Sequence, residues 1–234
     1  MGNLLTSTIG RKLIMSVSGL FLVLFLLFHM SMNLAAVFST EAYNAICEFL
    51  GANWYALAGT LILAAGVVVH LVYATVLTLH NRSSRGSQRY AMTAEPEGVT
   101  WASRNMYVLG IIIVLGLLLH LYNFWYNMQF AEIIGNHELG PFPPADGAAY
   151  IAALFSSPVY CIIYLVWFAA IWFHLTHGFW SAFHTIGWDN QTWLPRLKCI
   201  ANVVATIVFL CFALVVIVFY LRSLGVCGGS CVGF

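Results

Sequence analysis

Residues 13–40 read LIMSVSGLFLVLFLLFHMSMNLAAVFST, an uncharged run that directly follows Arg11 and Lys12. A helix needs about 20 apolar residues, at about 1.5 Å each, to cross the hydrocarbon core of a bilayer. The run therefore predicts one membrane-spanning helix. Its apolar part is longer than the roughly 7–15 apolar residues of a secretory signal sequence, so we expect it to be retained.

Four further uncharged runs extend over residues 49–81, 105–131, 147–188 and 199–221. The run over 147–188 is too long for one crossing, and Ser156-Ser157-Pro158 suits a helix start with proline in the first turn. We predict an all-α membrane protein with five transmembrane helices in a single domain, residues 1–234. The predicted spans are about 13–38, 53–80, 104–130, 157–184 and 197–221.

The composition of the chain agrees with a membrane protein. Of its 234 residues, 62% are hydrophobic and only 7% are charged, whereas about 25% of residues are charged in soluble domains. The net charge of +1 provides no large field for binding nucleic acid. The six cysteines include no CxxC or CxxCH spacing, although Cys227 and Cys231 could form a disulfide near the C-terminus.

The charged residues between the runs predict the orientation of the helices. With the N-terminus inside, the inner segments hold eight of the nine basic residues, and the exception is Arg222 at the outer end of the last helix. Positive charge concentrates on the cytoplasmic side of membrane proteins, so we predict N-in, C-out. The eight inner residues are Arg11, Lys12, Arg82, Arg85, Arg89, Arg104, Arg196 and Lys198.

Four of the eight histidines lie deep in four different runs, and they are His29, His70, His120 and His174. Ionisable side chains at this depth are costly and usually functional. Neutral imidazole binds iron well, and helix bundles build cofactor sites from side chains that point inward. We predict that the first four helices form a haem-binding bundle.

Counting residues to the flanking charges separates these histidines into two layers. His29 and His120 each lie 12 residues before an outer glutamate, whereas His70 lies 12 residues before the inner Arg82. His29 and His120 thus form an outer layer, and His70 and His174 an inner one, offset by about 6 Å. Two imidazoles from two helices in each layer meet the requirement of a b-type haem with two histidine ligands.

Two glycines support the same arrangement. Gly19 and Gly110 each precede an outer histidine by 10 residues, so each lies about 15 Å further in along its helix. A position without a side chain could admit the inner porphyrin, although glycine also serves close helix packing in membranes. Among the remaining histidines, His177 is the main alternative to His174 as a ligand, while His80 and His184 could form a third pair at the inner interface.

Four segments around these histidines carry a family resemblance. FLLFHMSMNL, VVVHLVYATVL, LLLHLYNFW and WFHLTHGFWSAF, with the spacing His174, Gly178, Trp180 in the last, resemble the two-haem cytochrome b subunit of bacterial succinate dehydrogenase or fumarate reductase. The resemblance covers essentially all five predicted spans. It implies that His29 and His120 hold one b-type haem and that His70 and His174 hold the other.

The resemblance also implies a location and partners. The chain would lie in the bacterial cytoplasmic membrane and bind a quinone, typically menaquinone. It would join an FAD-containing flavoprotein subunit and an iron–sulfur subunit, and two such heterotrimers could pair. The chain would then belong to an enzyme without itself binding succinate or fumarate, because its longest predicted inner segment, residues 81–103, is too short for a flavin domain.

One departure from the family concerns proton transfer. Some fumarate reductases of this family carry a glutamate two residues before the fourth ligand, where this chain has Trp172. A proton route at that position is therefore not expected. For a quinone site at the outer face, we expect Glu48 in AICEFLGANW to accept the proton, since apolar neighbours would raise its pKa, with Glu41 as the alternative.

Two other functions would place histidines in membrane helices. A cytochrome b of a hydrogenase or formate dehydrogenase would share the haems but have other partners. A transporter would carry protons or metal through its histidines and would be expected to have acids or broken helices at mid-membrane. No Asp or Glu lies inside any predicted span, which favours electron transfer.

Overall fold

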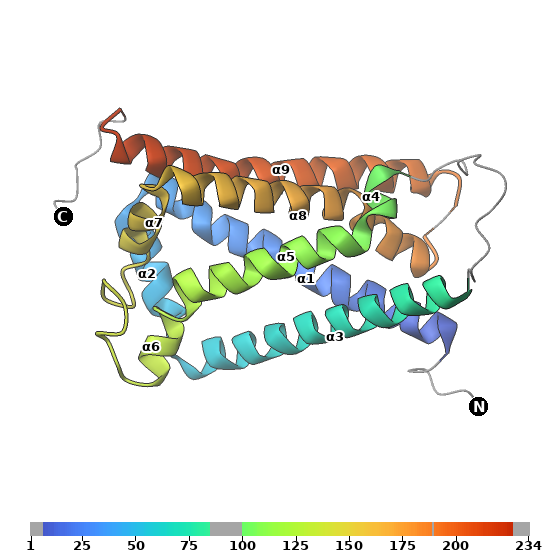
Figure 1. Cartoon of the computed structure of the whole chain (residues 1–234), viewed down its shortest axis with the longest axis horizontal. Helices are drawn as coiled ribbons and strands as arrows, with labels where there is room; N and C mark the ends of the chain where they lie inside the picture. Colours follow the sequence, from blue (N-terminus) through green and yellow to red (C-terminus); the bar gives the residue numbers. More distant parts are fainter. Residues whose placement is uncertain (1–6, 85–99, 189, 227–234) are drawn as a thin grey trace.

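The computed structural model describes residues 7–84, 100–188 and 190–226. Within these ranges, five helices are long and apolar enough to cross a membrane (Figure 1). They are α1 (Thr8–Phe38), α3 (Trp54–Ser84), α5 (Met106–His120) with the π-helix η1 (Leu121–Trp125) that continues it, α8 (Pro158–Thr185) and α9 (Trp193–Ser223). The prediction of an all-α protein with five candidate membrane spans is confirmed, and the chain is described below as a multi-pass membrane protein.

Four short helices join the long ones. They are α2 (Thr40–Phe49), α4 (Trp101–Arg104), α6 (Gln129–Ile133) and α7 (Gly147–Phe155). Helices α2, α6 and α7 gather at one end of the bundle and α4 lies at the other (Figure 1). We refer to these as the α7 end and the α4 end.

The predicted start of a helix is correct where it was inferred from a capping sequence. It is wrong where it was inferred from the charged residue that borders an apolar run. Helix α8 begins at Pro158 with Ser157 as its N-cap, as predicted. Helix α1 begins five residues before the predicted start, because the Ser7 hydroxyl accepts a hydrogen bond from the Gly10 backbone N–H (3.0 Å). Helix α9 likewise begins at Trp193, before its first charged residue, since a charge ends an apolar run but not a helix.

The third span departs most from the prediction. Its α-helical part ends at His120, and the next turn, Leu121–Trp125, is a π-helix rather than a continuation of the α-helix to about residue 130. Single π turns within α-helices occur frequently at functional sites. The turn begins immediately after one of the four deep histidines.

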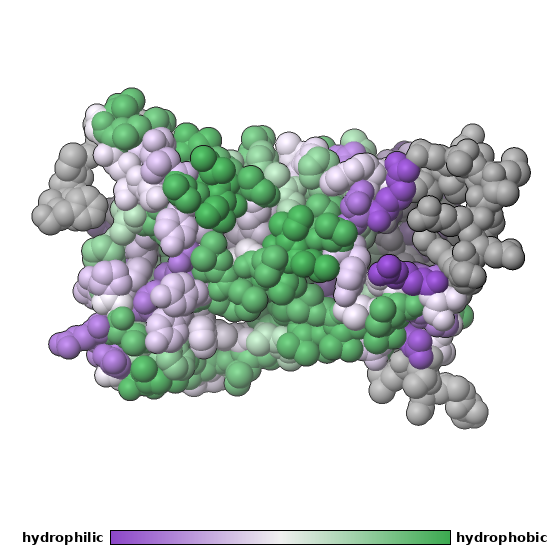
Figure 2. All heavy atoms as spheres, viewed as in Figure 1, coloured by the Kyte–Doolittle hydropathy of each residue, from purple (hydrophilic) through white to green (hydrophobic). Residues whose placement is uncertain are grey.

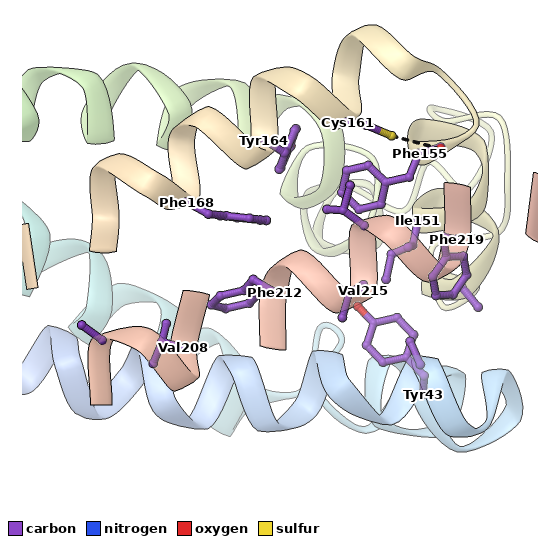
Figure 3. Close-up of a cluster of buried hydrophobic side chains, with 14 of the residues drawn as sticks. Tyr43, Ile151, Phe155, Cys161, Tyr164, Phe168, Val208, Phe212, Val215 and Phe219 are labelled. Atoms are coloured by element: carbon purple, nitrogen blue, oxygen red, sulfur yellow. Dashed lines mark hydrogen bonds between the residues drawn. The ribbon is translucent and has the colours of Figure 1, made fainter. Parts of the chain in front are cut away.

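The packing of the bundle centres on α8, α9 and α1. Helix α8 has its most extensive contacts with α9, and α1 contacts α3, α8 and α9, whereas α3 and α5 contact each other little. The core therefore includes the fifth helix: Phe212 of α9 stacks on Phe168 of α8 at a ring-centre distance of 5.2 Å (Figure 3). The predicted bundle of the first four helices thus has α9 as a fifth packing partner.

The outer surface of the bundle is apolar along its middle. Figure 2 shows apolar side chains over the centre of the bundle, with the most hydrophilic ones toward its ends. Large apolar side chains are exposed on all five long helices, for example Leu24, Leu61, Leu115, Val166 and Leu210. A lipid environment accommodates such a surface, whereas water does not.

Arg222, the basic residue that departs from the charge asymmetry, has a structural partner. Its guanidinium donates hydrogen bonds to the backbone carbonyls of Val37 (2.8 Å) and Ala36 (3.5 Å) at the C-terminus of α1. Those carbonyls have no partner within their own helix, and a cation also suits the negative end of the helix dipole. Arg222 thus ties the end of α9 to the end of α1.

Replacing Arg222 with methionine should lower the stability of the folded protein by about 1–3 kcal/mol, the range of a hydrogen bond to a charged group. The thermal midpoint of the detergent-solubilised protein, followed by circular dichroism, measures the change. Arg196→Met is the control, because Arg196 is exposed and lies over the Trp193 ring at 5.5 Å. An equal loss of stability in the two variants would show that Arg222 does not cap α1.

Candidate functional site

The first pair of deep histidines comes from α1 and α5. The rings of His29 and His120 lie 5.8 Å apart, centre to centre, with an angle of 86° between their planes. Phe25 stacks on His29 at 5.4 Å, and Phe212 of α9 lies 6.0 Å from the same ring. We call His29 and His120 the α7-end pair.

The second pair comes from α3 and α8. The rings of His70 and His174 lie 6.4 Å apart with an angle of 65° between their planes, and we call them the α4-end pair. The Ser18 hydroxyl lies 3.3 Å from Nδ1 of His70 and donates to the Met15 carbonyl (3.1 Å). The hydroxyl can therefore accept a hydrogen bond from Nδ1–H, which leaves Nε2 of His70 as the free ligand atom.

The spacing within each pair fits a metal held between two imidazoles. A metal–nitrogen bond to histidine is about 2 Å, and the ring centre lies about 1 Å beyond the nitrogen, so two rings on opposite sides of one metal are about 6 Å apart. The observed distances of 5.8 and 6.4 Å agree. Nδ1 of His174 and Nδ1 of His177 are both buried with no hydrogen-bond partner in the described part of the chain, so only the ring distances favour His174 over His177.

The donor set suits a haem better than a bare ion. Within residues 7–84, 100–188 and 190–226, no group of three or more His, Cys, Asp or Glu side chains is placed to hold a metal ion. Protein sites for bare transition metals commonly use three or four such ligands. A haem iron already has four porphyrin nitrogens and needs from the protein only the two axial ligands that each pair offers.

The two pairs are further apart than the residue counts predicted. A Cβ atom on Gly19 would lie 3.3 Å from Cε1 of His70, so Gly19 is level with the α4-end pair. His29 is ten residues further along the same helix, which separates the pairs by about 15 Å along the bundle rather than about 6 Å. The prediction of about 6 Å assumed that the flanking charged residues lie at the same depth on every helix. This assumption fails because some helices continue past these residues.

Open space lies between α3 and α5. A cavity of about 260 Å³ opens between α3 and α5, and a Cβ atom on Gly110 would meet nothing within 4 Å. Gly19 therefore lies against a candidate ligand, and Gly110 has open space beside it. The cavity is lined by Leu71, Ala74, Thr75, Tyr107, Ile111, Val114 and Leu115.

The other histidines lie elsewhere. His177 follows His174 by one turn, but its ring contacts Trp180 at 5.0 Å, and the ring that faces His70 is that of His174. His184 also contacts Trp180, at 6.4 Å, and His137 is exposed in the loop after α6. These positions make His174 a better partner for His70 than His177 is.

The acidic residues proposed for a quinone site lie near the α7 end. Glu48 is exposed close to the end of α2, so the apolar surroundings expected from its neighbours in the sequence are not found in the fold. The pKa of Glu41 is lowered by hydrogen bonds from its own backbone N–H and from the Ser39 hydroxyl. A lowered pKa makes Glu41 a poorer proton acceptor at neutral pH.

Sequence reasoning missed a polar cluster at the same end. The carboxylate of Glu132 accepts a hydrogen bond from the Ala52 backbone N–H (2.6 Å) and covers Gly51. The side-chain oxygen of Gln129 accepts hydrogen bonds from Thr60 and from the Trp125 indole, each at 2.9 Å. These residues are far apart in sequence, and only the return of α6 toward the start of α3 brings them together.

A second set of polar contacts leads away from His29. The amide nitrogen of Asn33 lies 3.3 Å from Nε2 of His29, and the Tyr43 hydroxyl donates to the Asn33 side-chain oxygen (3.1 Å). Burial raises the pKa of the Tyr43 hydroxyl and raises the pKa of the neighbouring Cys47 thiol to about 11. Both groups are therefore neutral at physiological pH and can act as hydrogen-bond donors near the α7-end pair.

No family model, curated protein or solved structure matches the chain. The functional assignment therefore depends on the geometry of the two histidine pairs and on the family resemblance of the sequence. Cys227 and Cys231, for which the sequence allows a disulfide, lie outside the described residues.

Proposed function

We propose that this chain is a two-haem cytochrome b, the membrane subunit of a succinate:quinone oxidoreductase or quinol:fumarate reductase. The observation that carries the proposal is the pairing of four deep histidines from four helices into two sets, each at the ring spacing of a bis-imidazole metal site. A haem bound at each pair would supply one-electron chemistry. Two haems would carry electrons between a substrate near the α7 end and a substrate near the α4 end of the bundle.

The roles of the protein side chains follow from their contacts. His29 and His120 would hold the haem at the α7 end, and His70 and His174 the haem at the α4 end. Ser18 keeps His70 oriented through its Nδ1 nitrogen, as hydrogen-bonded neighbours commonly do for metal-ligating histidines. Aromatic side chains beside the α7-end pair, such as Phe25 and Phe212 next to His29, would help to exclude water from it.

The orientation predicted from the charged residues would place each histidine pair next to a different electron-transfer partner. With the positive-inside rule, the α4 end faces the cytoplasm of the bacterial membrane, where a flavoprotein subunit with FAD and an iron–sulfur subunit would interconvert succinate and fumarate. The α7 end faces outward and would exchange electrons with a quinone, typically menaquinone. The dicarboxylate site would lie on the flavoprotein subunit and not on this chain.

A reduced-minus-oxidised difference spectrum of the purified chain tests the proposal. We expect the α-band of a b-type haem and, from a pyridine haemochrome assay, two haems per chain. A preparation that is folded by circular dichroism but carries no haem, even after haem is added back, would rule out the cytochrome. Co-purification with a flavoprotein that reduces fumarate or oxidises succinate would distinguish this enzyme from a hydrogenase or formate dehydrogenase.

If the exposed Glu48 carboxylate still accepts the quinol proton, replacing it with glutamine should leave both haems in place and reduce quinol-linked turnover of the assembled complex by about 100-fold or more. Succinate oxidation with an artificial acceptor at the soluble subunits should persist. Glu138→Gln is the control, since Glu138 is also exposed, in the loop between α6 and α7. Unchanged turnover in Glu48→Gln together with a loss in Glu132→Gln would assign the proton acceptor to Glu132 instead.

A further inference from the structure

The ring of His120 is enclosed by aromatic side chains. Trp167 of α8 lies 5.7 Å from it, centre to centre, at a shallow angle of 33°. Tyr164, one turn before Trp167, lies 6.4 Å away, and Phe124 of η1 lies 5.1 Å away. Of these contacts, that with Trp167 is the one closest to parallel.

The Trp167 indole is held in place from two sides. Its N–H donates a hydrogen bond to the backbone carbonyl of Ile113 on α5 (3.0 Å). The indole also lies over Gly116, where any Cβ atom would overlap it. The Trp167 side chain therefore extends from α8 to the backbone of α5, at a point where Gly116 leaves room for the indole.

The π-helix contributes to the same enclosure. Asn123, within η1, donates a hydrogen bond from its side-chain amide to the Tyr164 hydroxyl (3.1 Å). Tyr164 is buried and packs edge-on against Trp167 at 5.6 Å. The π turn after His120 thus positions the Asn123 amide, which holds the Tyr164 ring of α8 beside His120.

Trp167 also lies between the two histidine pairs. On α5, Ile113 and Gly116 are one to two turns from His120 in the direction of the α4 end. On α8, Trp167 precedes His174 by seven residues, about 10 Å along the helix. The indole therefore occupies the level between the α7-end pair and the α4-end pair.

We propose that Trp167 is a positioning residue for the α7-end pair: its indole fixes the rotation of the His120 imidazole, and through it the electronic properties of the haem that His29 and His120 would hold. The inference depends on the proposed function. Residues that orient a metal-ligating histidine tune the metal as well as hold the ligand. In most metal sites a hydrogen bond does this, and here a tilted aromatic contact, with 33° between the ring planes, restricts the ring.

The same helix supplies a matched control. Trp172 is also half-buried on α8, and its indole N–H donates across the bundle to the Thr206 hydroxyl of α9 (3.1 Å). Its recorded ring contact is with Phe173, not with a histidine. Loss of Trp172 removes a similar volume and a similar hydrogen bond without changing the surroundings of His120.

The test compares Trp167→Phe, Trp167→Leu, Trp172→Phe and Trp172→Leu by haem content, potentiometric titration and EPR of the oxidised protein. In a ferric low-spin haem with two imidazole ligands, near-perpendicular ligand planes give the largest g value. Loss of Trp167 should let the His120 ring rotate away from the 86° arrangement, lower the largest g value of one haem and shift its midpoint potential. The effect should be larger for leucine than for phenylalanine, and both haems should remain in Trp167→Phe.

His120→Ala identifies the affected signal, because that variant should lack it. Unchanged g values and potentials in the Trp167 variants, an equal change in the Trp172 variants, or a change restricted to the other haem would each overturn the role of Trp167. If Trp167→Leu does not fold, Trp167→Phe decides the question. A wild-type protein without haem would instead refute the proposed function, so the two failures can be told apart.

Discussion

Alanine in place of His29 or of His120 should leave the protein with the same single haem, and alanine in place of His70 or of His174 should leave it with the other one. The expectation follows from the pairing, since each haem would lose one of its two protein ligands while the second site lies about 15 Å away along the bundle. Haem content should fall from two per chain to one in each variant. The remaining haem is identified by its midpoint potential and by its EPR signal.

The pattern across the four variants is more informative than any one of them. Two variants that share a residual spectrum must have lost the same site, so the spectra by themselves report which histidines are partners. His177→Ala is the control, because His177 lies one turn from His174 but its ring faces Trp180. Loss of a haem in His177→Ala with both haems retained in His174→Ala would reassign the ligand. A residual spectrum shared by His29→Ala and His70→Ala would refute the pairing.

Leucine at Gly110 should remove the haem of the α4-end pair, although its Cβ atom would have open space around it. A Cβ atom at this position meets nothing within 4 Å, and replacing glycine within a helix commonly favours the helix by about 0.5–1 kcal/mol. The apo-protein should therefore fold at least as well as the wild type. Loss of one haem would then report that the porphyrin occupies the space beside Gly110.

Gly19→Leu should have the same outcome for a different reason. Its Cβ would already lie 3.3 Å from the His70 ring, so a larger side chain must displace a candidate ligand. In both glycine variants the spectrum that remains should match that of His70→Ala. Gly59→Leu is the control, since Gly59 is an exposed position on α3 with open space around it. Retention of both haems in Gly110→Leu would show that the porphyrin does not use this space.

Much of the architecture could be predicted from the sequence because it depends on local properties of the chain. An apolar run long enough for a bilayer becomes a helix wherever it occurs, and proline after a serine marks the start of α8 at Pro158. The four deep histidines stand out because ionisable side chains are rare in such runs. Their division into two layers also follows from residue counts, although the counts underestimated the separation.

The contacts across the bundle could not be predicted in this way. The direction in which a side chain points depends on the rotation of its helix and on its crossing angles with neighbours far away in sequence. The choice of His174 over His177 opposite His70, the Trp167 indole over Gly116, and the Glu132 carboxylate over Gly51 each depend on such packing. The π turn after His120 could not be predicted either, because LYNFW contains no glycine or proline to mark an irregular turn.

The order of residues along the chain is thus enough to predict the long apolar helices, their positions and the four deep histidines. The packing of the helices brings these histidines together in two pairs at 5.8 and 6.4 Å, with α9 completing the core and Trp167 between the pairs. A helix forms within one apolar run because the backbone groups of that segment satisfy one another's hydrogen bonds. The distance between two imidazoles is set by how several segments pack together.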